Sequence, residues 1–159
     1  MECTRHITAT VYLVNEGATV LHEHPKLGIH VPPGGHLDRD ELPHEAALRE
    51  AYEETGLEPE LVDDTDPVDA PAGRTLPDPR HTMLYDINVH EDGSVGHQHV
   101  DLIYFAHVGS RAIAPPAPAN EAPPEAWEWY DAERLRAGDV DADTTEIGIE
   151  AIEVVSGAR

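Results

Sequence analysis

The chain has 159 residues, 40% of them hydrophobic, and a formal net charge of −22 at pH 7 from 32 acidic and 10 basic side chains. This length fits one domain, residues 1–159, with a sizeable core, and the apolar content argues against global disorder. Such an acidic surface disfavours binding to nucleic-acid backbones and anionic membranes, and it suits the salt-rich cytosol of a halophile, where repulsion between acidic groups is screened.

Cysteine content and apolar runs indicate where the protein works. Cys3 is the only cysteine, so no internal disulfide can form and a reducing compartment is expected. The first residues carry no signal-peptide pattern, and no run approaches the roughly 18 apolar residues of a membrane span. We therefore expect a cytoplasmic protein that does not enter membranes, and the sequence leaves a homodimer open.

The first third of the chain predicts two strands, a structured loop and a helix. Residues 6–14 and 18–22 are largely apolar and rich in β-branched side chains, with a turn between them at 15–17. Prolines and glycines then mark a loop around a short strand. Pro43–Thr55 is predicted to be a helix, because Pro43 suits its first turn and Gly56 suits the position just past its end.

The remainder predicts further strands and one more clear helix. Residues 58–80 are expected to be mostly loop, because they contain five of the fourteen prolines. The other expected elements are strands at 81–89 and 99–108, a linker at 112–124, an aromatic strand and a helical turn in WEWYDAERL, and a helix at 144–155. Strands interleaved with two clear helices predict the α/β class, with a mixed sheet and a helix on each face.

The helix at 43–55 belongs to a longer pattern, GGHLDRDELPHEAALREAYEETGL. Its fixed positions are Gly35, Glu41, Arg49, Glu50, Glu53, Glu54, Gly56 and Leu57. The pattern is similar, position for position, to the signature of the Nudix hydrolase family, G-x5-E-x7-R-E-U-x-E-E-x-G-U, where U is a bulky aliphatic residue. Ala51 departs from it, which predicts slightly looser packing with intact chemistry. The flanking VPPGG and WYDAERL extend the likeness, which implies a Nudix-type α/β/α sandwich with a mixed central sheet.

Helical geometry alone gathers three carboxylates. At 100° per residue, Glu50, Glu53 and Glu54 share a wedge of about 100°, where their like charges repel. In so acidic a chain this face can be plain solvated surface, but a hard divalent cation, which needs converging oxygen ligands, would neutralise it. Leu48 and Tyr52 fall on the opposite side of the helix and are expected to face the core.

Residues beside this wedge have candidate supporting roles. Arg49 can hold one carboxylate from the flank, and Glu41 can accept helix N-terminal amides or orient the ligands from outside the metal. Gly34 and Gly35 are either an ordinary turn or a place where backbone, free of side chains, lies beside the metal and the phosphates.

The resemblance implies a chemistry and assigns roles to these residues. It implies hydrolysis of a nucleoside diphosphate linked to another group, with Mg²⁺ or Mn²⁺ as cofactor and water attacking phosphorus. Glu50, Glu53 and Glu54 are the candidate metal ligands and catalytic residues, and Arg49 has a supporting catalytic role. Gly35 is expected to contact metal and substrate, and Gly34 to contact substrate. Glu41 and Gly56 are expected to support the structure of the motif.

The sequence does not decide which carboxylate is the general base. It is one of the three helical glutamates or a later carboxylate, for which Glu121, Glu125 and Glu128 are available. Glu125 stands four residues before Trp129, at the offset usual for the family, with a plain surface acid as the alternative.

Outside the motif, histidines and basic residues are the next candidates. His97, His99 and Asp101 alternate along a predicted strand, so they share one face and suit substrate contact, a two-histidine, one-carboxylate metal site or a structural role. Lys26 and Arg80 can meet phosphate or remain solvated cations. Trp127, Trp129 and Tyr130 can stack on a base, although aromatics at strand spacing more often belong to the core.

The sequence therefore predicts a metal-dependent pyrophosphohydrolase acting on a small nucleoside diphosphate derivative. The alternative is a non-catalytic Nudix-fold domain that binds a nucleotide or regulates a partner. An acidic interaction domain is a third possibility, but it leaves the fixed spacing unexplained.

Overall fold

A computed structural model describes residues 2–117 and 122–157. The main sheet has the path β10-β2-β1-β9-β5, with β3 on β2, β4 on β1 and β8 on β9. Its strands are β1 (Thr4–Asn15), β2 (Ala18–Glu23), β3 (His30–Val31), β4 (Gly34–His36), β5 (Glu60–Leu61), β8 (His81–Val89), β9 (Val95–His107) and β10 (Trp127–Asp131). The helices are α1 (Pro43–Thr55), the 3-10 helix η1 (Pro124–Ala126), α2 (Ala132–Arg136) and α3 (Ala142–Gly157). A separate hairpin pairs β6 (Asp69–Ala70) with β7 (Gly73–Arg74).

The sheet is mixed because its two central strands run parallel while their neighbours run antiparallel. β1 and β9 pair in parallel from Thr4↔His97 to Val14↔His107, whereas β2, β4, β5 and β8 join this pair antiparallel. Alternating side chains of β1 and β9 then face opposite layers. This arrangement confirms the predicted α/β class and mixed sheet.

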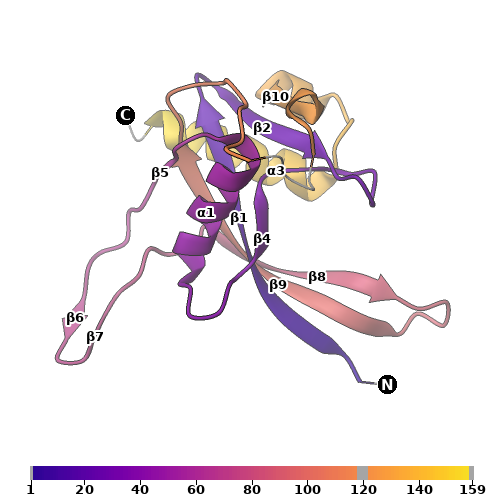
Figure 1. Ribbon diagram of the computed structural model, residues 1–159, viewed down its shortest axis with the longest axis horizontal. Helices are drawn as coiled ribbons and strands as arrows, with labels where there is room; N and C mark the ends of the chain where they lie inside the picture. The colour runs from indigo at the N-terminus through magenta and orange to yellow at the C-terminus, as the bar shows by residue number, and fades with distance from the viewer. Residues whose placement is uncertain (1, 118–121, 158–159) are drawn as a thin grey trace.

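One helix covers each face of the sheet (Figure 1). Alternate β1 residues such as Val11 pack with Ala46, Ala47 and Ala51 of α1. The other residues of β1 and β9 pack with α3, in a second core layer that includes Tyr12, Val14, Ile103, Phe105, Ile147, Ala151 and Val155. The site features described below therefore divide between an α1 face and an α3 face.

The prediction that Leu48 and Tyr52 face the core was wrong. Tyr52 is 43% exposed and Leu48 is only half-buried, whereas Ala46, Ala47 and Ala51 are fully buried. Small side chains let the helix lie close to the sheet, so the alanine face became the buried one and the larger residues remained at its margin.

Two extensions project from this core (Figure 1). The β6–β7 hairpin stands out on one side. On the other, residues 4–8 of β1, strand β8 and residues 95–100 of β9 form an arm that carries the chain's N-terminal end. Within the described ranges, no helix combines the length and apolarity that crossing a membrane requires.

Candidate active site

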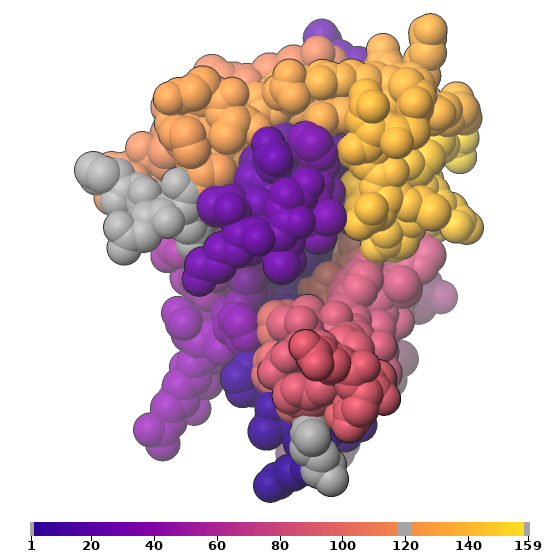
Figure 2. All heavy atoms as spheres, turned by 90° about the vertical axis from the view of Figure 1, so that its right-hand side faces the viewer, coloured from indigo at the N-terminus to yellow at the C-terminus, as the bar shows by residue number. Residues whose placement is uncertain are grey.

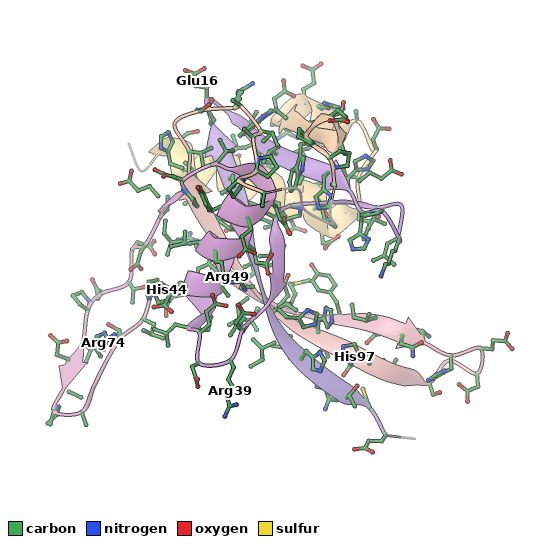
Figure 3. The ribbon with its side chains drawn as sticks, viewed as in Figure 1. Glu16, Arg39, His44, Arg49, Arg74 and His97 are labelled. Carbon is green, nitrogen blue, oxygen red and sulfur yellow. The ribbon has the colours of Figure 1, made fainter. Side chains whose placement is uncertain are left out.

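Arg49 on α1 organises the acidic residues of the motif. Its Nε donates to Glu41 Oε2 at 2.7 Å and its Nη2 to Glu41 Oε1 at 3.0 Å, a bidentate pair that suits the planar guanidinium. Its Nη1 donates to Glu50 Oε1 and to Glu53 Oε2, each at 3.1 Å. Arg49, marked in Figure 3, thus holds three carboxylates, where the sequence predicted one.

The same guanidinium ties the helix to the preceding loop. Arg49 Nη2 donates to the carbonyl oxygen of His36 at 3.2 Å, and Nε lies 3.4 Å from Asp38 Oδ2. Glu41 Oε1 also accepts the backbone N–H of Asp38 at 3.0 Å. The hydrogen bonds from Arg49 lower the pKa of Glu41, and this carboxylate in turn raises the pKa of Arg49. Asp38 is a member of this cluster that the sequence analysis did not identify.

Gly35 creates the space in which the Glu50 carboxylate lies. A Cβ at Gly35 would come within 2.7 Å of Glu50 Cδ and closer still to Oε1, so a side chain there would displace Glu50. At Gly34 a Cβ would instead come within 2.7 Å of Ala9 O and Thr10 Oγ1 on β1. Gly35 therefore shapes the acidic site, and Gly34 allows β4 to pack against β1.

Burial differs among the three helical glutamates. The Glu50 side chain is 12% exposed and that of Glu53 is 55% exposed, while Glu54 as a residue is 7% exposed. Solvent therefore reaches the cluster mainly at Glu53. Two enclosed carboxylates beside an accessible one form a set of oxygen donors that can hold a hard divalent cation.

The helix ends where the sequence predicted. Gly56 has φ +75° and its N–H donates to Tyr52 O at 2.8 Å, which is the left-handed C-terminal cap expected of glycine. A Cβ at Gly56 would also come within 2.5 Å of Ala114 C, so the loop after β9 passes directly over this position.

Comparison with known proteins identifies the family. The model of the NUDIX domain matches residues 4–149, which is most of the chain. The chain belongs to the NUDIX family. A NUDIX-family hydrolase from Clostridium perfringens is similar over 96% of this chain and 99% of its own, with 30% identity and a TM-score of 0.79.

More distant NUDIX structures share the fold. A MutT protein from Bacillus halodurans has a TM-score of 0.63 at 16% identity, over 92% of this chain and 82% of its own. A UDP-X diphosphatase has a TM-score of 0.57 at 17% identity, over 100% of this chain and 66% of its own. No curated protein matches the sequence. The family match and these hydrolase structures confirm the predicted family, the Nudix sandwich and a Nudix hydrolase as the class of enzyme.

The later carboxylates predicted as possible general bases differ in their surroundings. Glu125 is exposed on η1, which leads into β10 beyond β2, so its role as general base stays a prediction. Glu128 pairs with Arg134 Nη2 at 3.1 Å. Glu121 lies outside the described residues.

His97, His99 and Asp101 share one face of the sheet as predicted, but the Asp101 carboxylate is hydrogen-bonded to threonine side chains. Asp101 is buried, its Oδ1 accepts hydroxyls from Thr8 and Thr10, and its Oδ2 accepts from Thr10, all at 2.9 Å. A two-histidine, one-carboxylate metal site is therefore not formed. His97 and His99 lie on the α3 face of the sheet, and their contact with substrate stays a prediction.

The two basic residues that were candidates for phosphate binding, Arg80 and Lys26, have different surroundings. Arg80 pairs with Asp64 at 3.0 Å and its guanidinium lies over the Phe105 ring, so it is not a solvated cation. Lys26 is exposed in the turn after β2, and its role at phosphate stays a prediction.

The aromatic residues of β10 pack within the fold. Trp127 and Tyr130 are buried, and Trp129 donates its indole N–H to Arg111 O at 3.1 Å. The core alternative for these aromatics is the one that the structure supports.

Proposed function

We propose that this Nudix hydrolase is a Mg²⁺- or Mn²⁺-dependent pyrophosphohydrolase of a nucleoside diphosphate linked to another group. The observation that carries the proposal is that Arg49 holds Glu50 and Glu53 of α1 beside the side-chain-free surface of Gly35, with the buried Glu54 one turn after Glu50 on the same helix. The cluster combines oxygen donors, a fixed arrangement and access through Glu53.

The residues present suit a hard divalent cation. Carboxylate and backbone carbonyl oxygens are the donors that Mg²⁺ and Mn²⁺ prefer, and the space at Gly35 keeps backbone close to Glu50. Glu50, Glu53, Glu54 and the backbone of Gly35 would hold the metal. When bound, it would offset pyrophosphate charge and lower the pKa of a coordinated water.

The protein's own groups would position the reactants. Arg49 and Glu41 keep the ligand carboxylates in place, so the site is ordered before substrate arrives. One carboxylate takes a proton from the attacking water, whose oxygen bonds to phosphorus while the bridging P–O bond breaks. The products are two phosphate esters, one carrying the nucleoside side of the substrate and one the other group.

The net negative charge of the protein favours a metal cofactor and a small substrate. With a net charge of −22, the chain repels polyphosphates unless cations intervene. The same charge opposes binding to nucleic acid. We further propose that residues 1–159 act as one domain in a salt-rich cytoplasm.

The test is product release from a panel of nucleoside diphosphate sugars, dinucleotides and nucleoside triphosphates at high salt. Each substrate is assayed with Mg²⁺, with Mn²⁺ and with excess EDTA, and products are separated by ion-exchange chromatography. We expect at least one substrate to yield a nucleoside monophosphate only when metal is present. Binding of nucleotides without turnover of any of them would favour the non-catalytic alternative and overturn the proposal.

A further inference from the structure

Four histidines from three strands converge on the α3 face of the arm. His6 is on β1, His36 on β4, and His97 and His99 on β9. One ring nitrogen from each lies within 4.8 Å of the corresponding nitrogens of the other three. The chain has 11 histidines, so more than a third of them meet at one point.

Strand register explains the convergence. The parallel pair β1 and β9 sets His6 opposite His99, and His97 lies two residues earlier on the same face. β4 pairs with the other edge of β1, where His36 lies opposite Thr8. Ala9 and Val11 of β1 face α1 whereas Tyr12 and Val14 face α3, so the even-numbered side chains of β1 and those opposite them lie on the α3 face. The sequence predicted His97 and His99 together but not His6 and His36. His6 meets them through the β1–β9 pairing, which joins residues about 90 positions apart, and His36 joins through the separate β1–β4 pairing.

The rings are already packed in contact. The centroids of His6 and His97 are 4.6 Å apart, those of His36 and His99 are 4.8 Å apart, and those of His97 and His99 are 5.0 Å apart, all edge to face. Four protonated imidazoles at this spacing would repel one another.

We propose that His6, His36, His97 and His99 form a closed transition-metal site, selective for Zn²⁺ over Mg²⁺, distinct from the carboxylate cluster on α1. Imidazole nitrogens suit Zn²⁺, whereas oxygens suit Mg²⁺. Tetrahedral Zn²⁺ needs nitrogens about 3.3 Å apart, so small side-chain rotations would close the cluster. Thr4 Oγ1 lies 2.8 Å from His97 Nδ1, which leaves Nε2 of that ring for the metal.

The location indicates a structural role. Four protein ligands leave no open position for a substrate, as in structural zinc sites. The metal would fasten the arm to β4, the strand that carries Gly35, the first fixed position of the motif. Figure 3 marks His97 on this arm, well separated from Arg74 on the opposite extension, and Figure 2 shows the molecule from the side on which the arm projects.

The experiment is metal binding by the full-length chain, independent of any hydrolysis. Protein treated with EDTA is titrated with Zn²⁺ against a chromophoric chelator at high salt, with excess Mg²⁺ present to occupy carboxylates. Co²⁺ is added in parallel, because tetrahedral nitrogen coordination gives intense visible absorption and octahedral oxygen coordination does not. The variants are His6→Gln and His99→Gln, with His44→Gln on α1 as the matched control and circular dichroism to check folding.

We expect about one Zn²⁺ per wild-type chain, tetrahedral Co²⁺ bands, and at least a roughly tenfold weaker affinity in both cluster variants. His44→Gln should match wild type. Equal Zn²⁺ affinity in wild type and cluster variants, weak octahedral Co²⁺ bands only, or no Zn²⁺ retained by the folded wild-type chain would each overturn the proposal.

Discussion

At the scale of single residues, the glycines near the two ends of the motif, Gly35 and Gly56, have different structural roles. Gly35 leaves space for a flexible carboxylate, and Gly56 combines a positive φ with close backbone contact. Substitution by alanine should therefore separate activity from stability.

Gly35→Ala should reduce kcat/KM by about 10- to 100-fold, because the new Cβ displaces the Glu50 carboxylate by roughly an ångström. Its free energy of unfolding should fall by only about 1 kcal/mol, since a side-chain end can move aside. Gly56→Ala should lose more than about 2 kcal/mol, because alanine is strained at φ +75° and meets backbone of Ala114. Steady-state kinetics and urea unfolding measure both. A Gly35→Ala enzyme with wild-type kcat/KM would contradict the role given to this space.

The sequence predicted local helical geometry better than the surroundings of individual side chains. The places of Arg49 on α1 and of Gly56 just past its end were predictable because a helix fixes local geometry, whereas Gly35 and Glu41, which precede the helix, were identified through the family signature. The three carboxylate partners of Arg49 were not predictable, because a long side chain can reach several partners and the folded loop determines which of them lie close to it.

At the scale of elements, α1 was predicted to the residue, from Pro43 to Thr55. Its start and stop signals are local, so the sequence suffices. Its buried face was predicted wrongly because the sheet surface, and not the helix pattern, selected the alanines. β9 begins at Val95, earlier than the predicted residue 99, because the hairpin with β8 continues through a bulged region near Asn88.

The link between Arg49 and Glu41 joins the loop to the helix and gives a pH prediction. Because the pKa of folded Glu41 is lowered, its stabilising effect is complete above the ordinary glutamate pKa and is lost as pH falls through the lowered value. The stability difference between wild type and Glu41→Gln should therefore shrink as pH falls from about 6 to about 3.

Urea unfolding at constant salt measures this difference. Glu58→Gln, at an exposed glutamate just beyond α1, controls for the loss of one negative charge. A difference between wild type and Glu41→Gln that stays constant with pH would show that the ion pair does not stabilise the fold.

At the scale of the whole molecule, long-range pairing is the part that the sequence could not provide. The parallel register of β1 and β9 sets the histidine cluster and buries Asp101 between threonines, and no local signal specifies it. The net charge, in contrast, follows directly from the composition, and it gives a prediction for the molecule as a whole.

Divalent cations should stabilise the fold, because they neutralise carboxylates that repel one another on α1. At a Mg²⁺ concentration a hundred times its Kd, the midpoint of thermal unfolding should rise by about 5 to 10 °C. Thermal scans with Mg²⁺ and with NaCl of matched ionic strength separate binding from screening. A variant carrying both Glu53→Gln and Glu54→Gln should lose the extra shift. An equal shift in NaCl would contradict specific binding.

The most direct measurement is the metal dependence of kcat/KM in wild type, Glu53→Gln and Glu54→Gln, on the best substrate of the panel. Glu153→Gln, an exposed glutamate on α3, is the matched control. If the α1 carboxylates hold the catalytic metal, both α1 variants should fall by at least about 100-fold while remaining folded, and Glu153→Gln should stay within about twofold of wild type. Turnover by the α1 variants equal to wild type at every metal concentration would contradict the account.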